Sequence, residues 1–128
     1  MSDELEISGC LIIRNGKVLL LHREDKEHWE VPGGKVEEDE SPTQAAIRKT
    51  QEEIGQTPSL ESPFFSGEYM PPDSERIALW HCYRAEIEDE PEIQVKEFDE
   101  ARYVDPGNLD DLDLAPSLEM ILPALRKI

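Results

Sequence analysis

The strongest constraint on the fold is a helix whose two ends are both marked in the sequence. Ser41 is a preferred N-cap residue, Pro42 suits the first helical position, and Gln44 completes a capping box. Gly55 supplies the left-handed residue on which helices commonly end. The sequence therefore predicts a helix over about residues 42–54, entered through a loop that begins at a glycine pair.

Strand-like segments lie on both sides of this helix. Asn15-Gly16 separates two apolar, β-branched runs, which is a strong signal for a β-hairpin of residues 5–14 and 17–22. Further strands are expected over residues 60–70, 75–87 and 101–104, with a connection around Pro71-Pro72-Asp73 and a last helix over about 117–127. This order indicates a single α/β or α+β domain that spans residues 1–128.

Acidic residues outnumber basic ones by 30 to 13, so the formal net charge is −17. Such a surface repels nucleic acid polymers and anionic membranes, but not a small anion that arrives with its own metal ions. No apolar run approaches the ~18 residues that span a bilayer, and the N-terminus lacks a signal peptide's basic and apolar parts. A cytoplasmic protein without membrane or nucleic-acid partners is expected. Cys10 and Cys82 are expected to be reduced core thiols.

The predicted helix has two chemically different faces. Ile47, Thr50 and Ile54 share one face at spacings of three and four, and we expect them to pack on the sheet. The other face carries the charged residues Lys49, Glu52 and Glu53. Hard cations such as Mg²⁺ prefer carboxylate oxygens, so this face predicts a metal–phosphate site beside the glycine pair. The alternative is an ordinary solvated acidic face.

The whole segment resembles the Nudix box, G-x5-E-x7-R-E-U-x-E-E-x-G-U, in which U is bulky and apolar. The residues that match its fixed positions at the right spacings are Gly34, Glu40, Arg48, Glu52, Glu53 and Gly55. The hairpin, the VPGG entry and the LWHCYRAEI and EFDEARYV segments are also similar to those of small MutT-like members. The resemblance covers nearly the whole chain, from Leu5 to about Ile128.

This resemblance implies a fold and an activity. The fold would be an α/β/α sandwich around a mixed sheet. The activity would be hydrolysis of a nucleoside diphosphate linked to another group, with Mg²⁺ or Mn²⁺. The reaction expected most is that of a nucleoside triphosphate pyrophosphohydrolase, which releases a nucleoside monophosphate and pyrophosphate. The partner would be a small nucleotide, and the protein a monomer or a homodimer.

The resemblance also implies roles for individual residues. The expected metal ligands are Gly33, through its carbonyl, Glu52, Glu53 and Glu97, and the same three glutamates are the catalytic candidates. The expected substrate contacts are Arg23, whose alternative is an ordinary surface arginine, and Lys49. The expected structural residues are Gly34, Gly55 and the ion pair of Glu40 with Arg48.

One departure from the family pattern concerns the chemistry directly. The glutamate of the R-E pair is Lys49 here, and Thr50 and Gln56 replace apolar positions. At ~6 Å and an effective dielectric near 20, each pair of unit charges is worth about 3 kcal/mol, so a change from glutamate to lysine could weaken metal binding by several kcal/mol. The lysine stem is long enough to swing the charge into water, onto Glu53, or onto a phosphate. The alternative function is therefore a catalytically weak or inactive nucleotide-binding or interaction module.

Two further points about the chemistry stay open in the sequence. Without the R-E glutamate, the base that activates water would be Glu97, Glu52 or Glu100, in that order of preference. Base recognition is hardly visible, because Trp29, Tyr69 and Trp80 suit packing as well as stacking. In mutator-type members an asparagine near the start of the last helix reads the base. The matching position here is Leu118, which argues against that specificity.

Overall fold

The computed structural model describes residues 5–71 and 74–128. The N-terminal four residues, and part of the connection expected around Pro71-Pro72-Asp73, lie outside the described residues. The strands are β1 (Leu5–Arg14), β2 (Lys17–Arg23), β3 (His28–Glu30), β4 (Gly33–Lys35), β5 (Ser59–Tyr69), β6 (Ala78–Glu86) and β7 (Phe98–Val104). The helices are α1 (Pro42–Ile54), the 3₁₀ helix η1 (Pro106–Asp111) and α2 (Pro116–Leu125).

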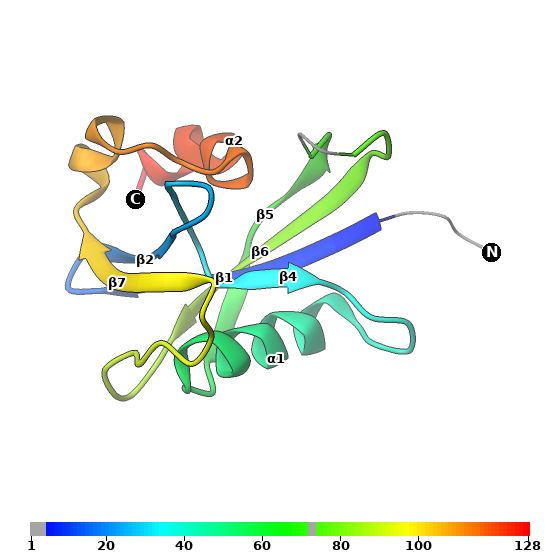
Figure 1. Ribbon diagram of the computed structural model, residues 1–128, viewed down its shortest axis with the longest axis horizontal. Coiled ribbons are helices and arrows are strands. Elements are labelled where there is room, and N and C mark those ends of the chain that lie inside the picture. The colour runs from blue at the N-terminus through cyan, green and yellow to red at the C-terminus, as the bar shows by residue number, and fades with distance from the viewer. Residues whose placement is uncertain (1–4, 72–73) are drawn as a thin grey trace.

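The strands form one mixed sheet between the two α-helices, with α1 on one face and α2 on the other (Figure 1). β1 lies at its centre and pairs in parallel with β6, while β5 extends the sheet antiparallel to β6. The far end of β1 turns into the hairpin with β2, which also pairs with β3 and β7. The expected α/β/α sandwich with a mixed sheet is therefore confirmed.

The two faces of the sheet follow from the alternation of apolar side chains along its strands. Cys10 and Ile12 pack in the cluster beneath α1, whereas Leu11 between them packs in the cluster beneath α2. The same alternation along β2 sends Leu19 to one side and Leu20 to the other. Successive strand residues point to opposite faces, so these continuously apolar strands make two cores.

Both cysteines are free and buried, as expected. Cys10 lies in the cluster beneath α1 and Cys82 in the cluster beneath α2. Burial raises the pKa of Cys10 to about 11 and also raises that of Cys82, so both thiols stay protonated at neutral pH.

Helix α1 has the predicted ends. Ser41 accepts a hydrogen bond from the backbone N–H of Gln44, whose side chain accepts one from the backbone N–H of Ser41. Gly55 closes the helix in the left-handed conformation, with a φ of 71°. Its two faces differ from the prediction, because Glu53 is buried beside Ile54 while Ile47 is only half-buried.

Several other elements differ in extent from the sequence-based expectations. β3 and β4 lie between the predicted hairpin and the predicted helix, and each is a three-residue strand that exists through its partner in the sheet. β7 begins earlier than expected, at Phe98, and η1 was not anticipated. α2 starts at Pro116 and continues past Pro123, which has no N–H to donate, to Leu125. No helix in residues 5–71 and 74–128 is long and apolar enough to cross a membrane.

Candidate active site

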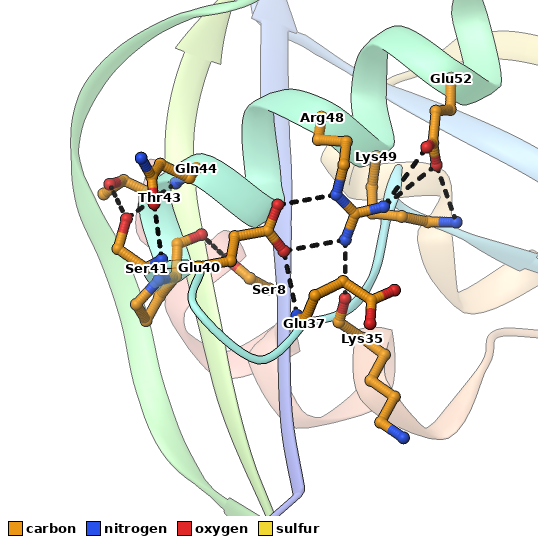
Figure 2. Close-up of polar contacts among 11 residues, drawn as sticks. Ser8, Lys35, Glu37, Glu40, Ser41, Thr43, Gln44, Arg48, Lys49 and Glu52 are labelled. Carbon is orange, nitrogen blue, oxygen red and sulfur yellow. Dashed lines mark hydrogen bonds and ion pairs between the residues drawn. The ribbon is translucent and has the colours of Figure 1, made fainter.

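The loop between β4 and α1 is fastened to the helix by Arg48. The expected ion pair is present: the guanidinium donates two hydrogen bonds to the Glu40 carboxylate, at 2.7 and 2.9 Å. It also donates to the Lys35 carbonyl at 3.0 Å and to Glu52 at 3.2 Å (Figure 2). Arg48 lowers the pKa of the Glu40 carboxyl to about 2, because its hydrogen bonds favour the charged form.

The carboxyl group of Glu53 is the buried acid of the site. Only 4% of the residue is exposed, and its Oε1 accepts a hydrogen bond of 2.9 Å from the Gly33 backbone N–H. Burial raises the pKa of Glu53 to about 7, although the Gly33 hydrogen bond and the charge of Lys49 lower it. A carboxyl group with a pKa near 7 can both accept a proton and release it at physiological pH.

The side chain of Lys49 lies between the two adjacent glutamates of α1. Its Nζ is 3.5 Å from Glu52 Oε1 and 3.8 Å from Glu53 Oε2. The stem runs across Gly34, where an added Cβ would come within 2.5 Å of Lys49 Cε. The absence of a side chain at Gly34 is therefore what allows the lysine to lie along the loop.

A pocket of about 550 Å³ opens beside this loop. Its apolar and aromatic lining comes from β1, β5, β6 and the start of α2, namely Ile7, Tyr69, Trp80, Ala115 and Pro116. The rest of the lining includes Arg23, Lys26, His28, Glu30 and the glycine pair Gly33-Gly34. A pocket with both apolar and charged lining suits a ligand with a flat ring and an ionic tail.

Comparison with known proteins agrees with this geometry. The sequence model of the NUDIX domain matches residues 6–125. The chain belongs to the NUDIX domain family. It is 32% identical over 124 residues to an 8-oxo-dGTP diphosphatase of Escherichia coli K12, a match that covers 94% of each chain. This relationship confirms the prediction of a MutT-like Nudix hydrolase and of an enzyme of pyrophosphohydrolase type.

Two other matches lie in the same family. A CTP pyrophosphohydrolase of E. coli K12 is 44% identical over 55 residues, which cover 40% of this chain and 41% of that protein. The solution structure of the E. coli ORF135 protein superposes with a TM-score of 0.80 at 29% identity, and the match covers 96% of this chain and 86% of that one.

In this Nudix chain Arg23 lines the pocket but is already paired. Its guanidinium donates two hydrogen bonds, at 3.0 and 2.9 Å, to Glu30 and lies over the Phe98 ring at 4.7 Å. The same carboxylate lies 2.8 Å from Nε2 of His28. Glu30 and His28 were not among the sequence candidates. The sequence signal that could have identified them is their spacing of two residues, which puts both side chains on one face of a strand.

The fourth expected metal ligand does not join the others. Glu97 is exposed just before β7, and its carbonyl accepts a hydrogen bond from the backbone N–H of Glu24. Within the described parts of the chain, no three His, Cys, Asp or Glu side chains converge closely enough to hold a metal ion. Glu100, the third candidate base, pairs with Arg102 at 2.7 Å. The roles expected for these two residues stay predictions.

The side chains of the box fit a divalent ion only in part. One oxygen of Glu53 is engaged by the Gly33 N–H, and its other oxygen faces the Lys49 ammonium. Glu52 is shared between Arg48 and Lys49. Mg²⁺ in proteins usually takes one or two carboxylates and completes its shell with phosphates and water. The arrangement is therefore not a complete protein site for such an ion.

The aromatic candidates and the start of α2 lie in the core, at the pocket, or in both. Trp29 and Trp80 are both buried in the cluster beneath α2, and Trp80 also lines the pocket together with the half-buried Tyr69. Leu118, the position matched to a base-reading asparagine, is fully buried in the core and does not line it. Two residues at the start of α2, Pro116 and Ser117, line the pocket, and the Ser117 carbonyl accepts a 3.0 Å hydrogen bond from the Trp80 indole.

Proposed function

We propose that this protein hydrolyses nucleoside or deoxynucleoside triphosphates to a nucleoside monophosphate and pyrophosphate. The observation that carries the proposal is the position of the pocket. The Gly33-Gly34 turn lines it, and the Gly33 N–H donates a hydrogen bond to the buried carboxyl group of Glu53. A nucleotide bound with its base against the aromatic lining would place its phosphates beside this turn and the box helix.

Different residues bind the different parts of the nucleotide in this proposal. Tyr69 and Trp80 bind the base and sugar, and the glycine turn lets the backbone approach the phosphates closely. Lys49 offers a point charge to a phosphate oxygen. The proposed metal-binding residues are Glu52, Glu53, Glu97 and the Gly33 carbonyl. The Mg²⁺ or Mn²⁺ that accompanies the nucleotide neutralises phosphate charge.

The chemical step exchanges one P–O bond for another. A water molecule attacks the α-phosphorus in line with the bridging oxygen, a new P–O bond forms, and the bond to that oxygen breaks so that pyrophosphate leaves. The water loses its proton to a carboxylate. Glu53 is a candidate for this proton beside those proposed from the sequence, because its carboxyl group is buried next to the glycine turn that lines the pocket.

A second function is favoured by Lys49 itself. The ammonium lies between the carboxylates of Glu52 and Glu53, on which catalysis would depend. Lys49 also occupies the position at which the family pattern has a glutamate. A Nudix domain altered in this way would bind a nucleotide and turn it over slowly or not at all. Binding is common to both functions, so turnover is the measurement that separates them.

The experiment is a substrate panel with wild type and Lys49→Glu measured side by side. The panel contains NTPs, dNTPs including 8-oxo-dGTP, ADP-ribose, dinucleoside polyphosphates and nucleotide sugars, with Mg²⁺ and with Mn²⁺. Release of pyrophosphate from a triphosphate by wild type supports the enzyme. Release only by Lys49→Glu supports the binding module. No release by either protein, together with no Mg²⁺-nucleotide effect on the melting temperature, contradicts both functions.

The remaining partner predictions belong to the same proposal. With a net charge of −17, the protein would act on free nucleotides and not on a nucleic acid polymer. A cytoplasmic location, where nucleotides are abundant, and a monomeric or homodimeric state complete the proposal.

A further inference from the structure

Lys49 is shared between two carboxylates without a short contact to either one. Its Nζ lies 3.5 Å from Glu52 Oε1 and 3.8 Å from Glu53 Oε2. A direct N–H···O hydrogen bond would be about 2.7–3.2 Å long. The ammonium therefore acts on both groups mainly through its charge, and its N–H groups are not committed to a single acceptor.

The position of this charge is held by packing. Only 26% of the Lys49 side chain is exposed. Its Cγ, Cδ and Cε all lie within 3.3 Å of where a Cβ at Gly34 would be, so the stem follows the loop backbone. A lysine on a free helix surface would instead extend into water.

The net charge of the cluster formed by Lys49, Glu52 and Glu53 equals that of a metal-loaded cluster of three carboxylates. Formally, the ammonium and the two carboxylates of Glu52 and Glu53 carry one net negative charge. Three carboxylates at these positions with one bound divalent cation would carry the same net charge. Lys49 thus presents incoming phosphates with the electrostatics of a cluster that already holds an ion.

We propose that the Lys49 ammonium takes the place of one protein-bound divalent cation, so that this Nudix chain contacts phosphate through a built-in cation. The inference rests on the proposed function, because Lys49 lies against Gly34, which lines the pocket proposed to bind the nucleotide. It predicts weak divalent-ion binding by the free protein and phosphate binding that persists when divalent ions are removed.

The first test is binding of Mn²⁺ alone to the nucleotide-free protein, followed by electron paramagnetic resonance. Lys49→Glu should bind Mn²⁺ at least about tenfold more tightly than wild type, because it exchanges a repelling charge for a ligand. Lys49→Gln removes the charge without adding a carboxylate, and its affinity should fall between the two. Wild type binding Mn²⁺ as tightly as Lys49→Glu overturns the inference.

The matched control for Mn²⁺ binding is Lys35→Glu. Lys35 is the exposed last residue of strand β4, and its side chain points away from Arg48 and Glu52 (Figure 2). This substitution changes the net charge as much as Lys49→Glu does, but at a distance from the carboxylates. It should leave the Mn²⁺ dissociation constant within about twofold of wild type. An equal gain in Lys35→Glu would make the effect one of net charge alone and overturn the inference.

The second test is calorimetric titration with ADP in EDTA, again without turnover. Wild type should bind ADP under these conditions, and Lys49→Gln should bind it at least about tenfold more weakly. Equal ADP binding by the two proteins overturns the inference. Absence of ADP binding by every variant, with Mg²⁺ as well as with EDTA, counts against the proposed function, and the Mn²⁺ comparison still decides the role of Lys49.

Discussion

The backbone N–H of Gly33 and the side chain of Glu53 are joined by a 2.9 Å hydrogen bond that ties strand β4 to helix α1. The bond crosses 20 residues of sequence and buries the carboxyl group beneath the glycine loop. It favours the charged form of Glu53, but burial opposes that form more strongly. The consequence is a carboxyl group that titrates near neutral pH at the edge of the pocket.

Glu53→Gln should stabilise the metal-free protein at high pH and leave it nearly unchanged at low pH. The folded-state pKa is raised from 4.5 to about 7, so the folded protein binds more protons than the unfolded chain between these values, and stability falls as pH rises through them. The full penalty, about 3 kcal/mol as an upper value, is present above pH ~7. Urea unfolding in EDTA at pH 4.5 and pH 8 measures it. A difference between wild type and variant that does not change with pH contradicts the assignment.

Gly33→Ala and Gly34→Ala should have very different effects on stability, although the residues are neighbours. A Cβ at Gly33 would lie 2.6 Å from the Ser8 carbonyl oxygen, so β4 would have to move away from β1. A Cβ at Gly34 meets only the flexible stem of Lys49. Thermal unfolding should show a loss of about 2 kcal/mol or more for Gly33→Ala and well under half of that for Gly34→Ala. Equal losses of stability in the two variants would show that the Lys49 stem cannot move aside for the added Cβ at Gly34.

Arg48→Gln should loosen the loop before α1 and remove a source of acid sensitivity. Arg48 lowers the pKa of Glu40 from 4.5 to about 2, so this pair stabilises the fold above pH 4.5 and its contribution is lost as pH falls through about 2. The variant should therefore lose stability at neutral pH and less at pH 2. Proteolysis of the loop over residues 36–41 reports the loosening. Glu40→Gln should cause the same loss, and the double variant no more than either one.

Tyr69→Ala should raise KM and change kcat little. Tyr69 lines the pocket, and stacking of an aromatic ring on a base is worth about 1–3 kcal/mol, so KM should rise about tenfold. The control is Tyr83→Ala, because Tyr83 packs in the cluster beneath α1 on the other face of the sheet. Steady-state kinetics on the best substrate of the panel measures both. A fall in kcat with unchanged KM would mean that the base lies elsewhere.

Glu53→Gln should reduce kcat far more than Glu97→Ala. A well-placed general base contributes about 10²–10⁴-fold, and Glu53 is buried beside the glycine turn. Glu97 is exposed and does not converge with the other carboxylates, so Glu97→Ala should cost less than about tenfold. A larger loss in Glu97→Ala would return Glu97 to the first position among the candidate bases.

Local signals in the sequence were sufficient for part of this molecule. The ends of α1 follow from Ser41, Gln44 and Gly55, because caps satisfy backbone groups within a few residues. The ion pair of Arg48 with Glu40 was accessible through the motif, since its two residues lie eight positions apart. The turn at Asn15-Gly16 needed only residues that accept positive φ, and both have it.

Long-range packing decided the rest. A pattern on the helix surface placed Glu53 with the exposed charges, but pairing of β4 with β1 brings Gly33 over its carboxyl group and buries it. The strands β3 and β4 are too short to show any periodicity, and they form because a sheet edge supplies their hydrogen bonds. The pocket joins Ile7, Tyr69, Trp80 and Ser117, which are scattered along the chain. The burial of a side chain depends on residues that are distant in the sequence, and the pKa of a buried acid depends on that burial. Neither can be read from the local sequence.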